Sequence, residues 1–297
     1  MTVPSLIGCA TALVTPFNAD GSVDEAAFGA LVDWQIAEGV DGLVPVGSTG
    51  EAATMTLEER VRVVRVAVER AKGRVPVIAG AGGNDTKVAI ATSKAMAEAG
   101  ASLLLHVSPM YSKPPQRGLL AHFRAIADAS PRPVVLYNVP GRTAGNIEAE
   151  TTLALAEHPN IVAVKEASGN LAQISEVIVH APERFSVLAG DDAITLAVIA
   201  MGGHGVVSVI SNAVPGKMAR LCAAASGGEM AAALALHQEL HPLMQAAFCE
   251  SNPIPIKAAL AMMGRIRNVL RLPLVPMDRK HEGRLRASLV EAEALPS

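Results

Sequence analysis

The feature of this 297-residue chain that most limits its fold is a regular alternation of short apolar runs with helical stretches. Runs rich in Val, Ile and Leu begin near residues 7, 42, 75, 103, 133, 161, 186 and 205, and each is followed by a helical pattern. Continuously apolar runs of this length are typical of strands buried on both faces of a parallel sheet. A series of such strand–helix units predicts an α/β fold, a (β/α)8 TIM barrel.

Helix boundary signals separate the apolar runs. The pairs Thr56-x-x-Glu59 and Ser22-x-x-Glu25 predict capping boxes at the starts of helices over 56–72 and 24–38, and glycines follow both helices. A doubly wound sheet would also alternate, but it often carries a Gly-rich dinucleotide-binding turn after its first strand. Here the first run leads into Thr15-Pro16-Phe17 instead, which favours the barrel.

The alternation stops at a Ser-Gly-Gly sequence at 226–228, and helical patterns alone follow, over 229–248, 254–263 and 280–293. We therefore expect a catalytic (β/α)8 barrel over residues 1–226 and a C-terminal helical subdomain, an appendage to the barrel, over residues 227–297. The sequence leaves open whether this appendage forms an assembly interface or braces the barrel.

Composition excludes several functional classes. An apolar content of 50% with 18% charged residues excludes a disordered chain. A net charge of −3 and an aromatic content of 3% argue against a nucleic-acid partner. There is no 18-residue apolar stretch, no signal-peptide pattern at the start and no paired cysteine spacing, so we expect a cytoplasmic enzyme that does not bind membranes. His237 and His241 lack a third ligand, and no metal site is predicted.

Lys165 is the most informative candidate residue, because it follows four apolar residues in a predicted interior strand. In such a barrel the active site lies at the carboxyl ends of the strands. Burial lowers a lysine pKa, and a free amine there is the nucleophile needed to form a Schiff base with a carbonyl compound. The alternative is a lysine that simply pairs with a carboxylate such as Glu166.

Other polar residues are expected at the same end of the barrel. Ser48 and Thr49 occupy a Gly-rich turn whose N–H groups and hydroxyls could hold a small carboxylate, although such turns are also common without a ligand. Tyr111 and Tyr137 are the only tyrosines of the chain, and each is either a proton carrier or a packing residue. Arg142 could bind a carboxylate or lie on the surface.

Two acidic residues have less direct interpretations. Glu51 opens a predicted helix, so we interpret it as a partner of the helix dipole or a supporting group rather than as a base. Asp192 is predicted to cap the helix that follows it.

Several motifs together resemble the dihydrodipicolinate synthase family, which lies within the pyruvate-dependent class I aldolase group that includes N-acetylneuraminate lyase. The likeness runs nearly from end to end. Its motifs are Ala12–Phe17, Gly47–Glu51, Tyr137–Thr143, Val164–Asn170, Gly190–Asp192 and Asn252–Lys257.

The resemblance implies a Schiff-base lyase that condenses pyruvate with L-aspartate 4-semialdehyde to 4-hydroxy-tetrahydrodipicolinate, on the route to diaminopimelate and lysine. Lys165 would form the Schiff base, so no separate cofactor is implied. Tyr137 would transfer protons, in a relay completed by Ser48 and by Tyr111. In the family the tyrosine matching Tyr111 comes from a neighbouring subunit, and the usual assembly is a homotetramer, a dimer of dimers.

The resemblance also implies binding roles. Thr49 and the backbone at Val207 would hold the pyruvate carboxylate, and Arg142 would hold the carboxylate of the aldehyde. Arg142 favours a synthase, because the sialate lyases generally lack an arginine in this loop. Ser48 does not favour a synthase, because the synthases often carry a threonine at this position and the lyases typically carry a serine.

Two alternatives remain open, and one regulatory feature is expected. The chain could instead be another pyruvate-dependent aldolase, such as an N-acetylneuraminate lyase or a 2-keto-3-deoxy sugar acid aldolase, or a binding protein for keto acids without activity. Relatives inhibited by lysine tend to carry His, Glu and a second Tyr at certain positions, so we predict weak or absent lysine feedback. Those positions hold Leu57, Arg60, Val88 and Met110.

Overall fold

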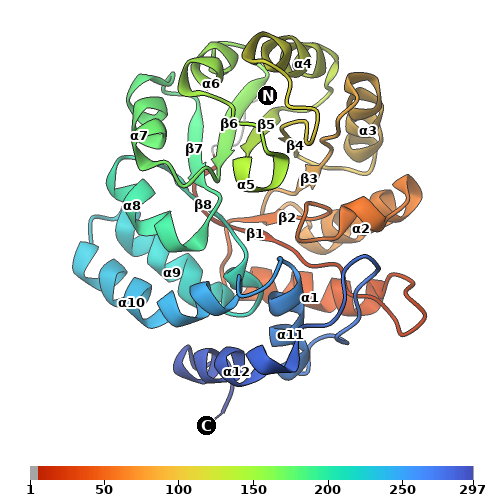
Figure 1. Ribbon diagram of the computed structural model, residues 1–297, viewed down its shortest axis with the longest axis vertical. Coiled ribbons are helices and arrows are strands. Elements are labelled where there is room, and N and C mark those ends of the chain that lie inside the picture. The colour runs from red at the N-terminus through yellow and green to blue at the C-terminus, as the bar shows by residue number, and fades with distance from the viewer. Residues whose placement is uncertain (1–5, 297) are drawn as a thin grey trace.

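The computed structural model describes residues 6–296, and its centre is a sheet of eight parallel strands surrounded by helices (Figure 1). The predicted (β/α)8 barrel is therefore confirmed. The strands are β1 (Gly8–Ala12), β2 (Gly42–Val44), β3 (Ile78–Gly80), β4 (Leu103–Val107), β5 (Val134–Asn138), β6 (Ile161–Glu166), β7 (Ser186–Ala189) and β8 (Gly205–Ser208).

The strand order is β2-β1-β8-β7-β6-β5-β4-β3, so β2 and β3 are the two ends of the hydrogen-bonded sheet. These ends also meet: Leu43 and Val77 form a parallel bridge, and the Gly80 N–H donates to the Pro45 carbonyl with an N···O distance of 3.1 Å. The sheet thus closes into a barrel, which brings the carboxyl ends of all eight strands to one mouth.

Helices connect the strands and cover the outside of the barrel (Figure 1). Along the chain they are α1 (Glu25–Ala37), α2 (Leu57–Ala71), α3 (Thr86–Glu98), α4 (Gln116–Ala129), the short α5 (Pro140–Thr143), α6 (Ala149–Ala156), α7 (Leu171–His180), α8 (Thr195–Ala200) and α9 (Pro215–Ser226).

Two packing layers explain why the strands are apolar on both faces. Inside the barrel, side chains such as Ala10, Val44 and Leu188 form one buried cluster. Alternate residues of the same strands, such as Cys9 and Leu43, pack outward against the helices in a second, larger cluster. Each strand therefore buries successive side chains in opposite directions, which removes the polar alternation of a one-sided sheet.

The two predicted capping boxes have different outcomes. The box at Thr56 is confirmed, with the Glu59 N–H donating to Thr56 Oγ1 and the Thr56 N–H donating to the Glu59 carboxylate. The box at Ser22 is wrong. Asp24, which directly precedes the helix, caps α1 by accepting from the Ala27 N–H at 3.0 Å, and the Ser22 N–H, which a capping box would direct to Glu25, donates to Asp20 instead.

The C-terminal segment is helical, as predicted, with α10 (Met230–Ala246), α11 (Ile254–Met262) and α12 (Glu282–Glu291). Helix α10 packs along α9, and α12 packs on α10 and α11 (Figure 1). Buried residues of α9 and α10, such as Leu221 and Leu243, belong to one continuous core. Residues 227–296 thus extend the packing of the barrel, and the separate subdomain predicted over 227–297 stays a prediction. No helix among the described residues is long and apolar enough to cross a membrane.

Candidate functional site

A cavity of about 590 Å³ opens at the carboxyl ends of the strands. It is walled by residues at the ends of strands and in the loops that follow them, and by the C-terminal segment. The predicted site residues on its wall are Ser48, Thr49, Tyr137, Arg142 and Lys165, and the C-terminal segment adds Phe248, Ser251, Asn252, Pro273 and Leu274.

Lys165 lies near the carboxyl end of β6 and is 5% exposed. Its neighbour across the sheet is Tyr137 on β5, and Lys165 Nζ lies 4.3 Å from the centre of the Tyr137 ring. Burial lowers the pKa of Lys165 to about 8, with the Asp192 carboxylate acting to raise it and Arg142 acting to lower it further. An amine with this pKa is partly unprotonated at neutral pH, which a carbonyl-attacking nucleophile requires.

The interpretation of Lys165 as an ion-pair partner of Glu166 is wrong. Adjacent strand residues point to opposite faces, so Glu166 points away from the cavity. Its carboxylate accepts from the Asn138 amide at 3.0 Å, from the Gln173 amide at 3.1 Å and from the Ser168 N–H at 2.7 Å. No carboxylate within residues 6–296 forms an ion pair with Lys165, which leaves its amine available to a ligand.

Tyr137 brings a phenol to the same cavity wall. It is 7% exposed, and burial raises its pKa to about 12, although the nearby Arg142 acts to lower it. A phenol with a raised pKa stays protonated near pH 7, so it can donate its proton to a developing negative charge on oxygen. Lys165 and Tyr137 therefore place a buried amine and a protonated phenol side by side, the groups that attack on a carbonyl carbon and proton donation would require.

The loop after β2 presents two hydroxyls, from Ser48 and Thr49. Thr49 Oγ1 accepts a hydrogen bond from the Asn252 amide with an N···O distance of 2.8 Å. The backbone carbonyl of Asn252 in turn accepts from Arg142 Nη2 at 3.1 Å. Two candidate carboxylate-binding residues, which follow the distant strands β2 and β5, are thus joined by Asn252 of the C-terminal segment, a residue that is 6% exposed.

The comparisons with known proteins agree with this geometry. The sequence profile of the dihydrodipicolinate synthetase family matches residues 5–292. The chain belongs to this family. It is 52% identical to the 4-hydroxy-tetrahydrodipicolinate synthase of Maridesulfovibrio salexigens over 95% of this chain and 97% of that one. It is also 52% identical to the 4-hydroxy-tetrahydrodipicolinate synthase of Koribacter versatilis, over 98% of this chain and 97% of that one.

Solved structures of dihydrodipicolinate synthases have the same fold. The Thermotoga maritima enzyme aligns with a TM-score of 0.96 at 40% identity, over 98% of this chain and all of that one. A synthase described as the first monomeric variant aligns with a TM-score of 0.96 at 40% identity, over 98% of each chain. The Cyanidioschyzon merolae enzyme with lysine bound aligns with a TM-score of 0.94 at 42% identity, over 97% of this chain and 98% of that one. The predicted family membership is confirmed.

In this dihydrodipicolinate synthetase family member, Glu51 anchors the loop that carries Ser48 and Thr49. Glu51 has a left-handed backbone (φ 55°) and a fully buried carboxylate. One carboxylate oxygen pairs with Lys257 Nζ at 2.6 Å, and the other accepts from the Arg271 N–H at 3.1 Å. The residue thus supports the loop, as expected from its sequence position, but its partners are C-terminal residues rather than a helix dipole.

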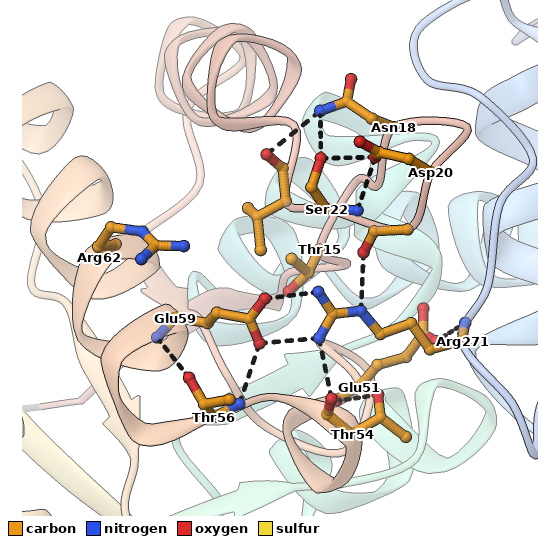
Figure 2. Close-up of polar contacts among 12 residues, drawn as sticks. Thr15, Asn18, Asp20, Ser22, Glu51, Thr54, Thr56, Glu59, Arg62 and Arg271 are labelled. Carbon is orange, nitrogen blue, oxygen red and sulfur yellow. Dashed lines mark hydrogen bonds and ion pairs between the residues drawn. The ribbon is translucent and has the colours of Figure 1, made fainter.

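Arg271 makes a second connection between the barrel loops and the C-terminal segment (Figure 2). Its guanidinium donates two hydrogen bonds to Glu59 of α2, at 2.6 and 2.8 Å, and further bonds to the Thr54 and Gly21 carbonyls. It also holds the pKa of Glu59 at about 2. These contacts hold the start of α2, which follows the loop carrying Ser48 and Thr49, against the C-terminal segment.

Sequence reasoning missed the roles of Asn252, Lys257 and Arg271. Their partners lie more than 200 residues earlier in the chain, a separation that no local pattern reveals. A signal was present for two of them, because Asn252–Lys257 was one of the family-like motifs.

Three predicted residues lie elsewhere than the cavity wall. Tyr111 is 92% exposed, with a left-handed backbone (φ 70°). Val207 is buried inside the barrel on β8.

The prediction that Asp192 caps a helix is wrong. Asp191 takes that role, and the Asp192 carboxylate is buried and accepts from the Val209 and Ile210 N–H groups at 3.0 and 3.1 Å.

Proposed function

We propose that this protein condenses pyruvate with L-aspartate 4-semialdehyde to form 4-hydroxy-tetrahydrodipicolinate, a step toward diaminopimelate and lysine. The observation that carries the proposal is the buried Lys165 amine beside the Tyr137 ring in the barrel mouth, in a chain about half identical to curated enzymes of that name. The buried amine supplies the covalent chemistry, so the proposal includes no separate cofactor, and it places the enzyme in the cytoplasm.

Lys165 Nζ adds to the ketone carbon of pyruvate, and the adduct loses water to give an imine. Loss of a methyl proton gives an enamine, whose carbon forms a bond with the aldehyde carbon while the aldehyde oxygen takes up a proton. The amino group of the condensed chain then attacks the imine carbon, releases the Lys165 amine and closes the ring. One water leaves overall. Tyr137 carries the protons, with Ser48 and Tyr111 completing the relay.

The substrate carboxylates have separate binding groups in this proposal. Thr49 and the backbone at Val207 hold the pyruvate carboxylate near Lys165. Arg142 binds the carboxylate of the aldehyde. The position of Arg142 on the cavity wall supports this role. The Asn252 carbonyl accepts from one guanidinium nitrogen, and within residues 6–296 the other guanidinium nitrogens form no hydrogen bond, which leaves them for a bidentate contact.

Tyr111 requires a neighbouring subunit in this proposal, and the proposed assembly is a homotetramer, a dimer of dimers. The support is its 92% exposure and its absence from the cavity wall of its own chain. Other exposed apolar side chains occur at the starts of α2 and α3 and beside Tyr111, as expected for a surface that another subunit covers. They are Leu57, Val88 and Met110.

The test is an assay of the purified enzyme with pyruvate and a panel of aldehydes, following pyruvate consumption. We expect aspartate 4-semialdehyde to give the highest kcat/KM, and Arg142→Ala to raise KM for this aldehyde by about tenfold or more, because a charged hydrogen-bonded contact is lost. Higher turnover with a sugar-derived aldehyde would favour the other pyruvate-dependent aldolases. No turnover with any aldehyde would favour a binding protein.

A further inference from the structure

We propose that Asn252 is a positioning residue that acts through Thr49: its amide directs the Thr49 hydroxyl toward the pyruvate carboxylate and so sets the affinity for pyruvate. This inference rests on the proposed function, in which Thr49 binds that carboxylate. It assigns a role in pyruvate recognition to a residue of the C-terminal segment, outside the β-strands and their connecting loops.

The contact that carries the inference is a buried hydrogen bond between distant parts of the chain. Asn252 precedes α11, and its Nδ2 lies 2.8 Å from Oγ1 of Thr49, in the loop after β2. Both residues line the cavity, and they are 6% and 4% exposed. Within residues 6–296 this is the one hydrogen bond that the Thr49 hydroxyl makes. The direction of the hydroxyl therefore depends on Asn252.

The chemistry of the two groups decides which way the hydroxyl hydrogen points. An amide N–H can only donate, whereas a hydroxyl can accept and donate at once. When Thr49 Oγ1 accepts from Asn252, its own hydrogen stays available for a different acceptor. A substrate carboxylate has acceptor oxygens only. Asn252 thus orients the Thr49 hydroxyl as a hydrogen-bond donor before pyruvate enters. This orientation reduces the entropy cost of ordering the hydroxyl when pyruvate binds.

Asn252 touches the two proposed carboxylate sites through different atoms. Its side chain contacts Thr49, while its backbone carbonyl accepts from Arg142 Nη2. A side-chain substitution removes the first contact and leaves the carbonyl in place. The effect on pyruvate can therefore be separated from the effect on the aldehyde.

The surrounding structure holds Asn252 in place independently of its side chain. Five residues further along, Lys257 Nζ donates to Glu51, in the same loop as Thr49, and to the Thr15 carbonyl at 2.9 Å. The backbone N–H of Arg271 donates to the second carboxylate oxygen of Glu51 (Figure 2). Removing the Asn252 amide thus leaves the loop and the C-terminal segment joined at Glu51.

The experiment compares Asn252→Asp and Asn252→Ala with the wild type. The aspartate variant has nearly the same shape, but a carboxylate only accepts, so it takes the Thr49 hydrogen for itself and repels pyruvate. The first readout is the pyruvate concentration that gives half-maximal borohydride-trapped adduct on Lys165. The second is KM for aspartate 4-semialdehyde. Asn268→Asp, on an exposed asparagine of the same segment, is the matched control.

We expect the half-saturating pyruvate concentration to rise about tenfold in Asn252→Ala and further in Asn252→Asp, with KM for the aldehyde within about twofold of wild type. Asn268→Asp should leave both unchanged. In a Thr49→Val background, Asn252→Ala should add no further effect, because the two residues act as one unit.

Two results would overturn the inference. One is an unchanged half-saturating pyruvate concentration in both variants at Asn252. The other is an equal rise in both constants, which would mean a purely structural role. Absence of any trapped adduct in the wild type would refute the proposed function itself, so the two failures are distinguishable.

Discussion

The ion pair between Glu51 and Lys257 gives the clearest test of how the C-terminal segment is joined to the barrel. Glu51 Oε1 and Lys257 Nζ lie 2.6 Å apart, and neither side chain is exposed to solvent. Burial lowers the pKa of Lys257, and the Glu51 charge acts to raise it again. Replacing Lys257 with Met keeps the length of the side chain and removes its charge, so the Glu51 carboxylate loses its partner inside the protein.

Removing one partner of a buried ion pair typically costs about 3–5 kcal/mol. The Arg271 N–H still donates to the second oxygen of Glu51, so we expect a value near the lower end, about 3 kcal/mol. The double variant Glu51→Gln with Lys257→Met buries no net charge and keeps the acceptor oxygen for Arg271. It should therefore recover most of the lost free energy of unfolding, since replacing both partners of such a pair is often nearly neutral.

The assay is urea unfolding at pH 7, followed by circular dichroism and restricted to conditions under which unfolding is reversible. Lys280→Met is the control, because Lys280 forms its ion pair with Asp278 on the surface, and we expect a change of at most about 0.5 kcal/mol. A loss below about 1 kcal/mol in Lys257→Met, or a double variant no more stable than the single one, would mean that this buried ion pair does not hold the C-terminal segment to the barrel.

Three further predictions follow from the site and its supports. Because Arg271 lowers the pKa of Glu59 from 4.5 to about 2, their pair stabilises the fold fully above pH 4.5 and loses this effect as the pH falls toward 2. The difference in unfolding free energy between wild type and Glu59→Gln should therefore shrink over that range, and a constant difference would contradict it. If Tyr111 serves a neighbouring subunit, mixing Tyr111→Phe with Lys165→Ala should restore up to about a quarter of wild-type activity, and no restoration would argue against a shared site. Lysine at about 1 mM should lower activity less than about twofold, and strong inhibition in a titration below that concentration would refute the predicted lack of feedback.

The sequence predicted the barrel because burial on both faces of the sheet leaves a local mark: each strand is a continuous apolar run. It predicted Lys165 for a related reason, since a charged residue ending such a run must face a cavity or a partner. The error at Ser22 has a local cause as well. Asp24 lies closer to the start of the helix and accepts a hydrogen bond from the Ala27 N–H. The Ser22 hydroxyl donates a hydrogen bond to Asp20.

Sequence patterns did not predict the long-range contacts that hold the site residues in place. Asn252 is separated from Thr49 by 203 positions, and Lys257 from Glu51 by 206. Such pairs are brought together only when the barrel closes and the C-terminal helices pack on it. Asp192 shows the same limit, because its position after a strand suggested a helix cap, but packing of β7 beside β8 directs its carboxylate to the Val209 N–H.

Borohydride trapping with pyruvate across the pH range, with the modified residue identified by peptide mass spectrometry, measures whether burial activates the Lys165 amine. We expect one adduct, on Lys165. Its rate should rise about tenfold per pH unit and level off near pH 8, because an amine with a pKa of about 8 is already free in roughly one molecule in ten at pH 7. An adduct on another lysine, no adduct, or a rate still rising steeply at pH 10 would contradict the claim that burial in the barrel mouth activates this amine.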